Sequence, residues 1–215
     1  MHSEFKFLMD KADSSAAPIF LDTEIDRLLN IAVEKFVSKR AFGNNPRRTG
    51  FEEDQKRRDD LRNLIKQADI GLDAYSSIEG SELPGEPLYS NKPNSAFITL
   101  PSDYRHTINE ECTLKGGKRV GVKPITHDRY NKIIDDPFHS PDGNVIYRLD
   151  AGEDKFELLY AQGQDISKYL LRYIKNPDVI GASNGAGSEE VKGCNLANHT
   201  HREIVRMAVV DALET

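Results

Sequence analysis

Apolar residues recur at intervals of three and four positions in the segment that begins at Leu21. These positions are Ile25, Leu28, Leu29, Ala32, Val33, Phe36 and Val37. The spacing places them along one face of a helix, because an α-helix completes a turn in about 3.6 residues. We therefore predict a helix from Leu21 to about Arg40, with Leu28 and Phe36 in the core.

Two further segments carry helical patterns. After the turn at 44–50, Thr49 and Glu52 resemble a capping box. The first half of this helix is charged, with neighbours of opposite sign that suit either a solvated face or a subunit contact. Its apolar positions, confined to the later half, are Leu61, Leu64, Ile65 and Ala68. A third helix closes the chain, with Thr200 and Glu203 as a second capping box and an apolar stripe behind them.

Short runs rich in β-branched and aromatic residues occupy the middle of the chain, where they predict strands. The candidates are 95–100, 107–114, 118–123, 145–149, 155–160 and 168–174. A short helix is expected at 127–134, ending before Asp136-Pro137, because a residue that precedes proline is disfavoured in the α region. The turn at 150–154 predicts a hairpin between its flanking strands. We expect the sheet to be antiparallel and meandering.

These elements predict an α+β fold, a small helical bundle from the N- and C-terminal helices with an antiparallel β insertion. Residues 1–20 are polar and rich in small side chains, which predicts an extended N-terminal arm. The bundle takes residues 21–73 and 195–215, and the β region takes 96–180. Between them lie an exposed proline-containing loop at 74–95 and a flexible glycine-rich loop at 181–194.

Composition and charge narrow the classes of function. With 38% apolar and 30% charged residues, the chain has the composition of a globular protein that can bury a core. The net charge of −6 argues against wrapping nucleic acid, which needs a surplus of Lys and Arg. No signal peptide or membrane-spanning run is evident, so we expect synthesis in the cytosol. Cys112 and Cys194 are expected to be inert, without a disulfide or a zinc site.

A search for catalytic chemistry finds no convergent site. Ser102, Asp103 and His106 bring together the residue types of a triad, but Ser102 lacks the strained turn of a nucleophile, and Asp103 better suits a turn. His199 and His201 are two positions apart and so face different sides of a helix. The glycine-rich loop lacks the Lys-Ser/Thr ending of a phosphate loop. His127 and His139 lack partners at a recognisable spacing, and adjacent carboxylates such as Glu110 and Glu111 diverge on a strand.

Three stretches resemble structural proteins of the crAss-like phages that infect Bacteroides: residues 5–37, 100–111 and 156–180. The end of the chain resembles them most. The matching positions there are Cys194, Leu196, His199, His201, Glu203, Ile204, Val205, Ala208, Val209, Ala212, Leu213 and Glu214.

This resemblance implies a virion structural protein, a head-to-tail connector or portal-adaptor ring subunit that lines the genome exit path. It implies self-assembly into a ring, commonly of twelve, with contacts to the portal protein and to neighbouring ring or tail proteins. Contact with packaged or ejected DNA would be passive, without a membrane partner. We expect assembly in the bacterial host cytoplasm, no enzyme activity, no cofactor, and no catalytic, cofactor-binding or metal-binding residues.

Two alternatives stay open. One is a phage assembly or interaction factor that is not part of the virion, and the other is a hydrolase or nuclease with a dispersed site. For a ring subunit, we expect the interface contacts in Met1–Pro18, Phe51–Arg62, Ala74–Ser95 and Gly181–Lys192, because polar arms and loops can order on a neighbour.

Overall fold

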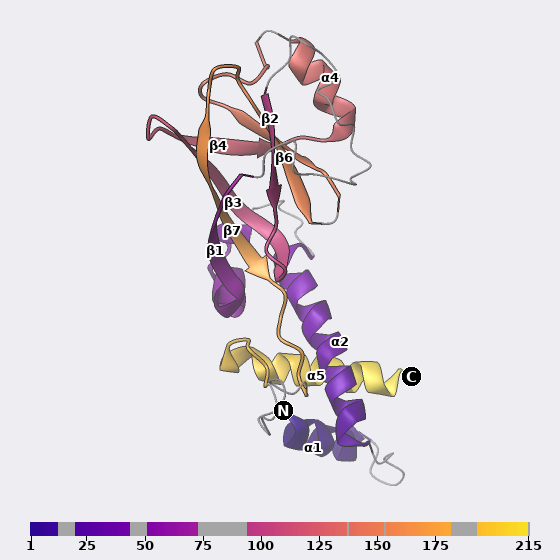
Figure 1. Cartoon of the computed structure of the whole chain (residues 1–215). Helices are drawn as coiled ribbons and strands as arrows, with labels where there is room; N and C mark the ends of the chain where they lie inside the picture. Colours follow the sequence, from indigo (N-terminus) through magenta and orange to yellow (C-terminus); the bar gives the residue numbers. More distant parts are fainter. Residues whose placement is uncertain are drawn as a thin grey trace. The chain divides into compact units, whose positions relative to one another are not determined.

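The computed structural model describes residues 1–12, 20–43, 51–72, 94–136, 138–152, 154–181 and 193–214 (Figure 1). The chain divides into two compact units. We call them the helical unit, which contains Met1–Ile65 and Lys175–Thr215, and the sheet unit, which contains Lys66–Ile174. In sequence, the sheet unit is therefore an insertion into the helical unit.

The helical unit is built from α1 (His2–Ala12), α2 (Asp22–Ala41), α3 (Gln55–Leu61) and α5 (His201–Leu213). Short 3₁₀ turns are η1 (Phe51–Glu53), η2 (Arg62–Leu64) and η4 (Asn198–Thr200). Helix α2 packs against α1, α3 and α5. Its predicted apolar face is confirmed except at Leu28, which is only half-buried, whereas Leu29 and Phe36 are fully buried. Leu28 was therefore wrongly assigned to the core.

The start of the chain is helical, so the predicted extended arm is wrong for the part that the structure describes. Phe5 and Met9, four residues apart on α1, are both buried. The Phe5 ring also meets the Phe20 ring edge-on, with centroids 5.7 Å apart. The buried apolar side chains thus form the packed face of α1, and the helix contacts α5 and α2. Residues 13–19 lie outside the described residues.

The sheet unit holds most of the strand structure (Figure 1). In chain order the strands are β1 (Ile65–Ile70), β2 (Asn94–Thr99), β3 (Tyr104–Leu114), β4 (Arg119–Pro124), β5 (Ile146–Asp150), β6 (Lys155–Tyr160) and β7 (Ile166–Lys175). They form one seven-stranded sheet in the order β1-β7-β3-β4-β5-β6-β2. Strands β3 and β4, β5 and β6, and β2 and β6 pair antiparallel, whereas β4 and β5 pair parallel.

The predicted fold class is therefore wrong. The protein is dominated by a curled, mixed sheet that resembles half a barrel, and is not a small helical bundle with an antiparallel insertion. The predicted antiparallel meander is also wrong, because strands that are neighbours in the sheet are often distant in sequence. The predicted strands and the β5–β6 hairpin are themselves present. The parallel pair is joined by a connection that contains α4 (His127–Asp135), since parallel strands need a crossover.

Alternation along the strands separates two faces of the sheet. On one face a single core forms from Ile98, Leu100, Cys112, Leu114, Val120, Ile146, Phe156, Leu158, Ile166, Tyr169, Leu171 and Tyr173. On the other face Tyr147, Leu149 and Leu159 form a smaller cluster, which the α4 residues Tyr130 and Ile133 cover. Buried apolar residues thus lie on both faces of β5 and β6, at adjacent positions such as Ile146 and Tyr147 in β5 and Leu158 and Leu159 in β6.

The second predicted helix ends earlier than expected. Leu61 and Leu64 are fully buried in the helical unit, but Ile65 begins strand β1. Ala68 and Ile70, two residues apart, instead pack against the sheet core. Pairing with β7 supplies the hydrogen bonds that a helix would have made, so tertiary structure overrides the local apolar spacing.

Candidate functional site

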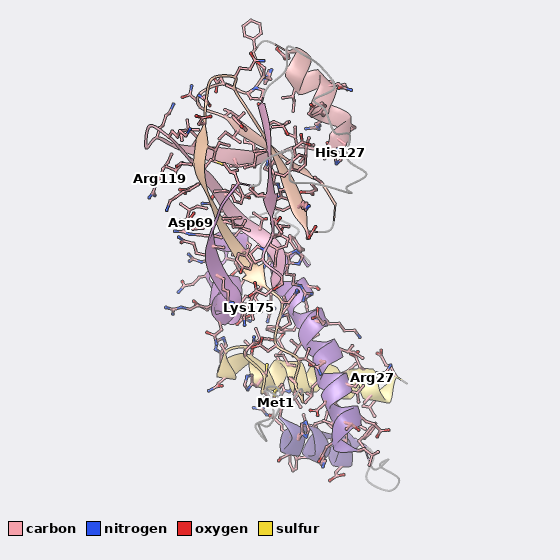
Figure 2. All side chains as sticks on the ribbon, viewed as in Figure 1. Met1, Arg27, Asp69, Arg119, His127 and Lys175 are labelled. Carbon is pink, nitrogen blue, oxygen red and sulfur yellow. The ribbon has the colours of Figure 1, made fainter. Side chains whose placement is uncertain are left out.

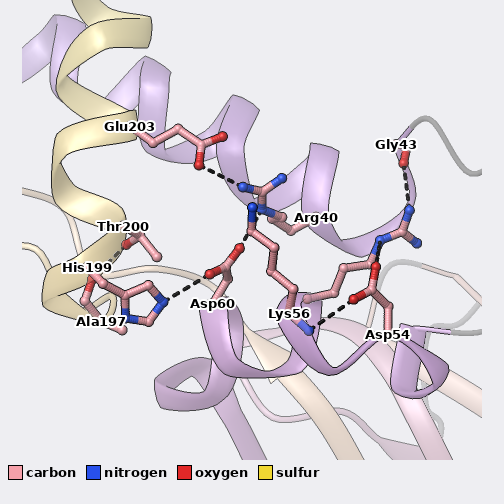
Figure 3. A network of polar contacts seen from close by, with 10 residues as sticks. Arg40, Gly43, Asp54, Lys56, Asp60, Ala197, His199, Thr200 and Glu203 are labelled. Atoms are coloured by element: carbon pink, nitrogen blue, oxygen red, sulfur yellow. Dashed lines mark hydrogen bonds and ion pairs between the residues drawn. The ribbon is translucent and has the colours of Figure 1, made fainter.

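Four side chains from three parts of the chain meet in the helical unit, and we call them the polar clamp. They are Arg40 near the end of α2, Asp60 in α3, His199 in η4 and Glu203 in the first turn of α5. Arg40 Nε lies 2.7 Å from Asp60 Oδ2, and Arg40 Nη2 donates to Glu203 Oε2 at 2.7 Å (Figure 3). His199 Nε2 lies 3.0 Å from Asp60 Oδ1. The polar clamp thus connects α2, α3 and the start of the last helix.

The centre of the polar clamp is shielded from water. The Asp60 side chain is 4% exposed and that of Arg40 is 15% exposed, whereas Glu203 and His199 reach the solvent. The guanidinium also lies over the Phe36 ring, 4.9 Å from its centroid, which is a cation–π contact. A buried carboxylate is costly unless it is paired, so Arg40 has to remain opposite Asp60 when the helices pack. The polar clamp is therefore a network of ion pairs that holds helices together.

The polar clamp changes the interpretation of the last helix. Thr200 and Glu203 do not form the predicted capping box, because the Thr200 hydroxyl donates to the Ala197 carbonyl at 2.7 Å and the Glu203 carboxylate binds Arg40. His201 Nε2 lies 3.1 Å from the Leu196 carbonyl oxygen. Several polar positions of the chain-end motif therefore fasten this helix to its surroundings.

The charged helix α3 is anchored at its start. Asp54 accepts a hydrogen bond from the Lys56 backbone N–H at 2.9 Å, and Arg57 lies 3.5 Å from the same carboxylate. Arg57 also donates to the Gly43 carbonyl at 3.3 Å. Asp60 points inward to the polar clamp, and so belongs neither to a solvated face nor to a subunit contact. Lys56, Arg58 and Asp59 are exposed. Thr49, in the predicted capping box, lies outside the described residues.

The triad types Ser102, Asp103 and His106 lie in and just after a turn in the sheet unit. Tyr104 N–H donates to the Pro101 carbonyl at 2.9 Å, which closes the turn predicted there. Asp103 accepts hydrogen bonds from Lys66 and from the Tyr173 hydroxyl, each at 2.7 Å. These contacts, that of Lys66 first, hold the pKa of Asp103 below its usual value. Asp103, which directly precedes β3, is therefore bonded to a residue near the start of β1 and to one near the end of β7.

Burial changes the acid–base properties of the neighbouring aromatic and histidine side chains. Burial and the contact with Asp103 raise the pKa of Tyr173 to about 12. Burial, together with the charge of Arg105, lowers the pKa of His106. Both side chains thus favour their neutral forms at neutral pH, which suits a structural position in the sheet.

A second buried ion pair lies in the sheet core. Arg148 Nη1 is 3.0 Å from Glu110 Oε1, and the guanidinium lies over the Phe156 ring, 4.0 Å from its centroid. Burial raises the pKa of Glu110. Glu111 turns to the other side of β3, where Arg119 is 4.0 Å away. The two glutamates point to opposite sides of the strand, as the alternation predicts, so they are not placed to act together as a catalytic acid and base.

The remaining candidate residues are engaged locally or buried. His127 Nε2 lies 2.9 Å from the Asp150 carbonyl oxygen, and His139 Nδ1 lies 2.7 Å from Asp136 Oδ2. Burial raises the pKa of Cys112 to about 12, which keeps that free thiol protonated, and it also raises the pKa of Cys194. Within the described ranges, no group of three or more His, Cys, Asp and Glu side chains is placed to hold a metal ion.

The predicted interface segments are described only in part. The first segment contains α1 (His2–Ala12), and residues 51–62 contain the charged helix α3. Almost all of the loops 74–95 and 181–192 lies outside the described residues. On the described surface, the sheet unit carries cross-strand charge pairs such as Lys168 and Asp69, 3.0 Å apart. Figure 2 shows Asp69 and Arg119 at the surface of the sheet unit. No helix among the described residues is long and apolar enough to cross a membrane.

Two comparisons agree with the resemblance found in the sequence. A family described as phage tail ring protein 3/4 matches residues 1–214. The protein named Ring protein 3 of Bacteroides phage crAss001 is 31% identical over 131 residues, which cover 54% of this chain and 55% of that relative. The alignment thus spans about half of the relative's length. The resemblance to ring proteins of crAss-like phages is confirmed.

Proposed function

Because the chain belongs to the phage tail ring protein 3/4 family, we propose that it forms a ring at the head-to-tail junction of a crAss-like phage. The family is structural and is not a family of enzymes, and its members are parts of the tail. Our proposal adds the position, between the portal and the tail. The observation that carries the proposal is the family match over residues 1–214.

The partners in this proposal are other copies of the chain, the portal protein and neighbouring ring or tail proteins. A closed ring of twelve copies would assemble in the host cytoplasm and become part of the virion. Each copy in such a ring needs two different contact surfaces. In a head-to-tail ring, the first surface of one copy binds the second surface of the next copy. The polar clamp supports this role, since it gives the helices a fixed orientation from which such surfaces can be presented.

We also propose that the ring lines the path of the genome. The net charge of −6 suits such a wall, because an acidic surface repels the DNA phosphates and lets the duplex slide. Purified rings are then expected to bind duplex DNA weakly at moderate salt, measured by gel shift. Tight binding, or a channel lined mainly by Lys and Arg, would contradict this part of the proposal.

Electron microscopy of the purified protein, alone and mixed with its portal, tests the main proposal. We expect closed rings, and in the mixture we expect them on the tail-facing end of the portal. A protein that stays monomeric and does not bind the portal would overturn the proposal. Copurification with mature particles at ring stoichiometry would separate it from an assembly factor that leaves the virion.

Charge reversal on α3 tests one predicted interface segment. Lys56 and Arg58 are exposed, so Lys56→Glu with Arg58→Glu is expected to leave the fold intact and to weaken ring formation. Arg206→Glu on α5 is the matched control, because that side chain is also exposed in the helical unit. Equal ring yields from all these variants would remove α3 from the proposed interface.

A further inference from the structure

Two carboxylates share one guanidinium inside the sheet unit. Arg148 Nη1 lies 3.0 Å from Glu110 Oε1, and Arg148 Nη2 lies 3.4 Å from Asp150 Oδ1. The Glu110 side chain is 5% exposed, whereas that of Asp150 is 69% exposed. The single positive charge of Arg148 is thus placed between one buried carboxylate and one that reaches the solvent.

Further contacts hold Arg148 in the sheet core. Its Nη1 also donates to Thr107 Oγ1 at 3.3 Å, and the guanidinium lies over the Phe156 ring, 4.0 Å from its centroid. The Thr107 hydroxyl is in turn 2.8 Å from the Tyr104 hydroxyl. These contacts do not depend on the charge of Glu110, so they can keep Arg148 in place when Glu110 gains or loses a proton.

The pairing of Glu110 with Arg148 leaves buried polar atoms without partners. Among the described residues, Glu110 Oε2, Arg148 Nε and the Tyr169 hydroxyl are buried and make no hydrogen bond. Such atoms are uncommon in folded proteins, because each has given up its hydrogen bonds to water. The ion pair therefore satisfies only part of the polar groups that the sheet core encloses.

Tyr169 on β7 is a neighbour of Glu110 that suits either protonation state. Burial raises the pKa of Glu110, and the contacts with Arg148 and Tyr169 only partly oppose this. Burial and the charge of Glu110 raise the pKa of Tyr169, so its hydroxyl stays protonated. A neutral hydroxyl can donate a hydrogen bond to an ionised carboxylate or accept one from a carboxylic acid.

The remaining ionisable groups around Glu110 supply no second positive charge. Asp150 raises the pKa of Glu110 further, and burial raises the pKa of Cys112 to about 12, so that thiol is neutral. The cations of the neighbouring strands that alternate with core residues point to the other face of the sheet. They are Arg119, Lys123, Lys155, Lys168 and Arg172. When Glu110 is ionised, two negative charges thus face one positive charge, and uptake of one proton balances them.

We propose that Glu110 is a proton-binding switch in the sheet core, and that Arg148 moves its ion pair from Glu110 to Asp150 when the proton binds. The proton comes from the solvent and binds at Glu110 Oε2, the oxygen without a partner. The new O–H group can then donate to the Tyr169 hydroxyl. Arg148 keeps a carboxylate partner throughout, which avoids the main cost of breaking a buried ion pair. The switch does not depend on the proposed ring function.

The proposal predicts that the sheet unit gains stability on acidification. The pKa of Glu110 is raised above its unfolded value of 4.5, so the folded protein binds the proton more tightly than the unfolded chain does. The resulting stabilisation is fully present below pH 4.5 and is lost as the pH rises through the folded pKa. Asp103 behaves in the opposite way, because its pKa is lowered.

Carbon NMR of the full-length protein measures the proton binding directly. The Glu110 carboxyl carbon is assigned through its bonded side-chain carbons, and its chemical shift is followed from about pH 3.5 to about pH 8. We expect a titration midpoint above 4.5. A midpoint at or below 4.5 would overturn the proposal. This measurement uses the unaltered chain, so it does not rely on a variant that folds.

The variant Asp150→Asn tests the movement of Arg148. It removes the carboxylate that receives the guanidinium, so we expect the Glu110 midpoint to fall. Asp154→Asn, at another exposed acid four residues later, is the matched control and should shift the midpoint less. Crystal structures on either side of the midpoint should show Arg148 farther from Glu110 and closer to Asp150 at low pH. Equal midpoints in the two variants, or unchanged distances, would refute the movement of Arg148.

Urea unfolding gives a second readout. Glu110→Gln keeps the shape of the neutral acid but cannot ionise. The ratio of its folding equilibrium constant to that of the unaltered protein should rise as the pH increases above 4.5. The total rise is about tenfold for each unit by which the folded pKa exceeds that value. Glu111→Gln, on the other side of β3, is the matched control and should keep the gain on acidification, because Glu110 is intact. A constant ratio for Glu110→Gln, or one that falls as the pH increases, would contradict the proposal.

Discussion

Removal of the Asp60 carboxylate is the most direct test of the polar clamp. In the variant Asp60→Ala, Arg40 keeps Glu203 as a partner on its outer side but loses the partner that faces the interior. The Arg40 side chain is only 15% exposed, so water does not readily replace the lost carboxylate. We therefore expect a large loss of stability.

The magnitude follows from the burial of the pair. Breaking a buried ion pair by removing one partner costs about 3–5 kcal/mol, and the slight exposure of Arg40 favours the lower end. A loss of about 3 kcal/mol lowers the melting temperature of a chain of this size by roughly 6–12 °C. Glu203→Gln should cost less than about 1 kcal/mol, because the Glu203 side chain is 43% exposed.

Thermal and urea unfolding, followed by far-ultraviolet circular dichroism, measure both variants against the unaltered protein. A double-mutant cycle with Arg40→Met isolates the interaction between the two side chains. Strong coupling is expected between Arg40 and Asp60. A loss below about 1 kcal/mol for Asp60→Ala, or coupling no greater than that between Arg40 and Glu203, would refute the assignment of a buried, essential pair.

Three other predictions concern the core, the pH dependence and a turn. Phe36→Ala should destabilise the protein by about 3–5 kcal/mol and the half-buried Leu28→Ala by about 1 kcal/mol, measured by urea unfolding; equal losses would contradict the burial of α2. The pKa of Asp103 is lowered below its unfolded value of 3.8, so its stabilisation is present above pH 3.8 and is lost as the pH falls. Asp103→Asn should therefore destabilise the protein at pH 7, and this difference should shrink as the pH falls below 3.8; a difference that grows on acidification would be inconsistent with it. Gly117 has a φ of 80°, so Gly117→Ala should lower the free energy of unfolding by about 1–2 kcal/mol. Gly116→Ala should leave it nearly unchanged when both variants are measured by urea unfolding.

The sequence predicted most elements but not the way the strands combine. Short runs rich in β-branched and aromatic residues predicted β2 to β7, because such residues favour the extended conformation of a strand. The parallel pairing of β4 with β5 had a usable signal, since a strand, a helix and a strand in succession favour a crossover. Pairing of β7 with β1 and β3 depends on contacts between residues about 100 and 60 positions apart, respectively, which local patterns do not encode.

The polar clamp was missed for a similar reason. Asp60 lies within a run of charges in sequence, and nothing local distinguishes it from its exposed neighbour Asp59. The capping-box spacing of Thr200 and Glu203 correctly marked the start of a helix but suggested the wrong hydrogen bonds. A partner for Glu203 becomes visible only when Arg40, 163 residues earlier, is brought alongside.

The polar clamp also raises the question of why a ring subunit keeps a buried ion pair. Replacing such a pair with apolar side chains is often neutral or stabilising, so stability alone does not explain it. Our hypothesis is that its directional contacts fix the angle between α2, α3 and α5, because apolar stripes alone permit small shifts in packing. An angular error repeated around a ring prevents closure. The variant Arg40→Met with Asp60→Leu is therefore expected to melt within a few degrees of the unaltered protein yet to give fewer closed rings by electron microscopy. A full yield of closed rings from a well-folded double variant would contradict this hypothesis and leave the pair without a role in assembly.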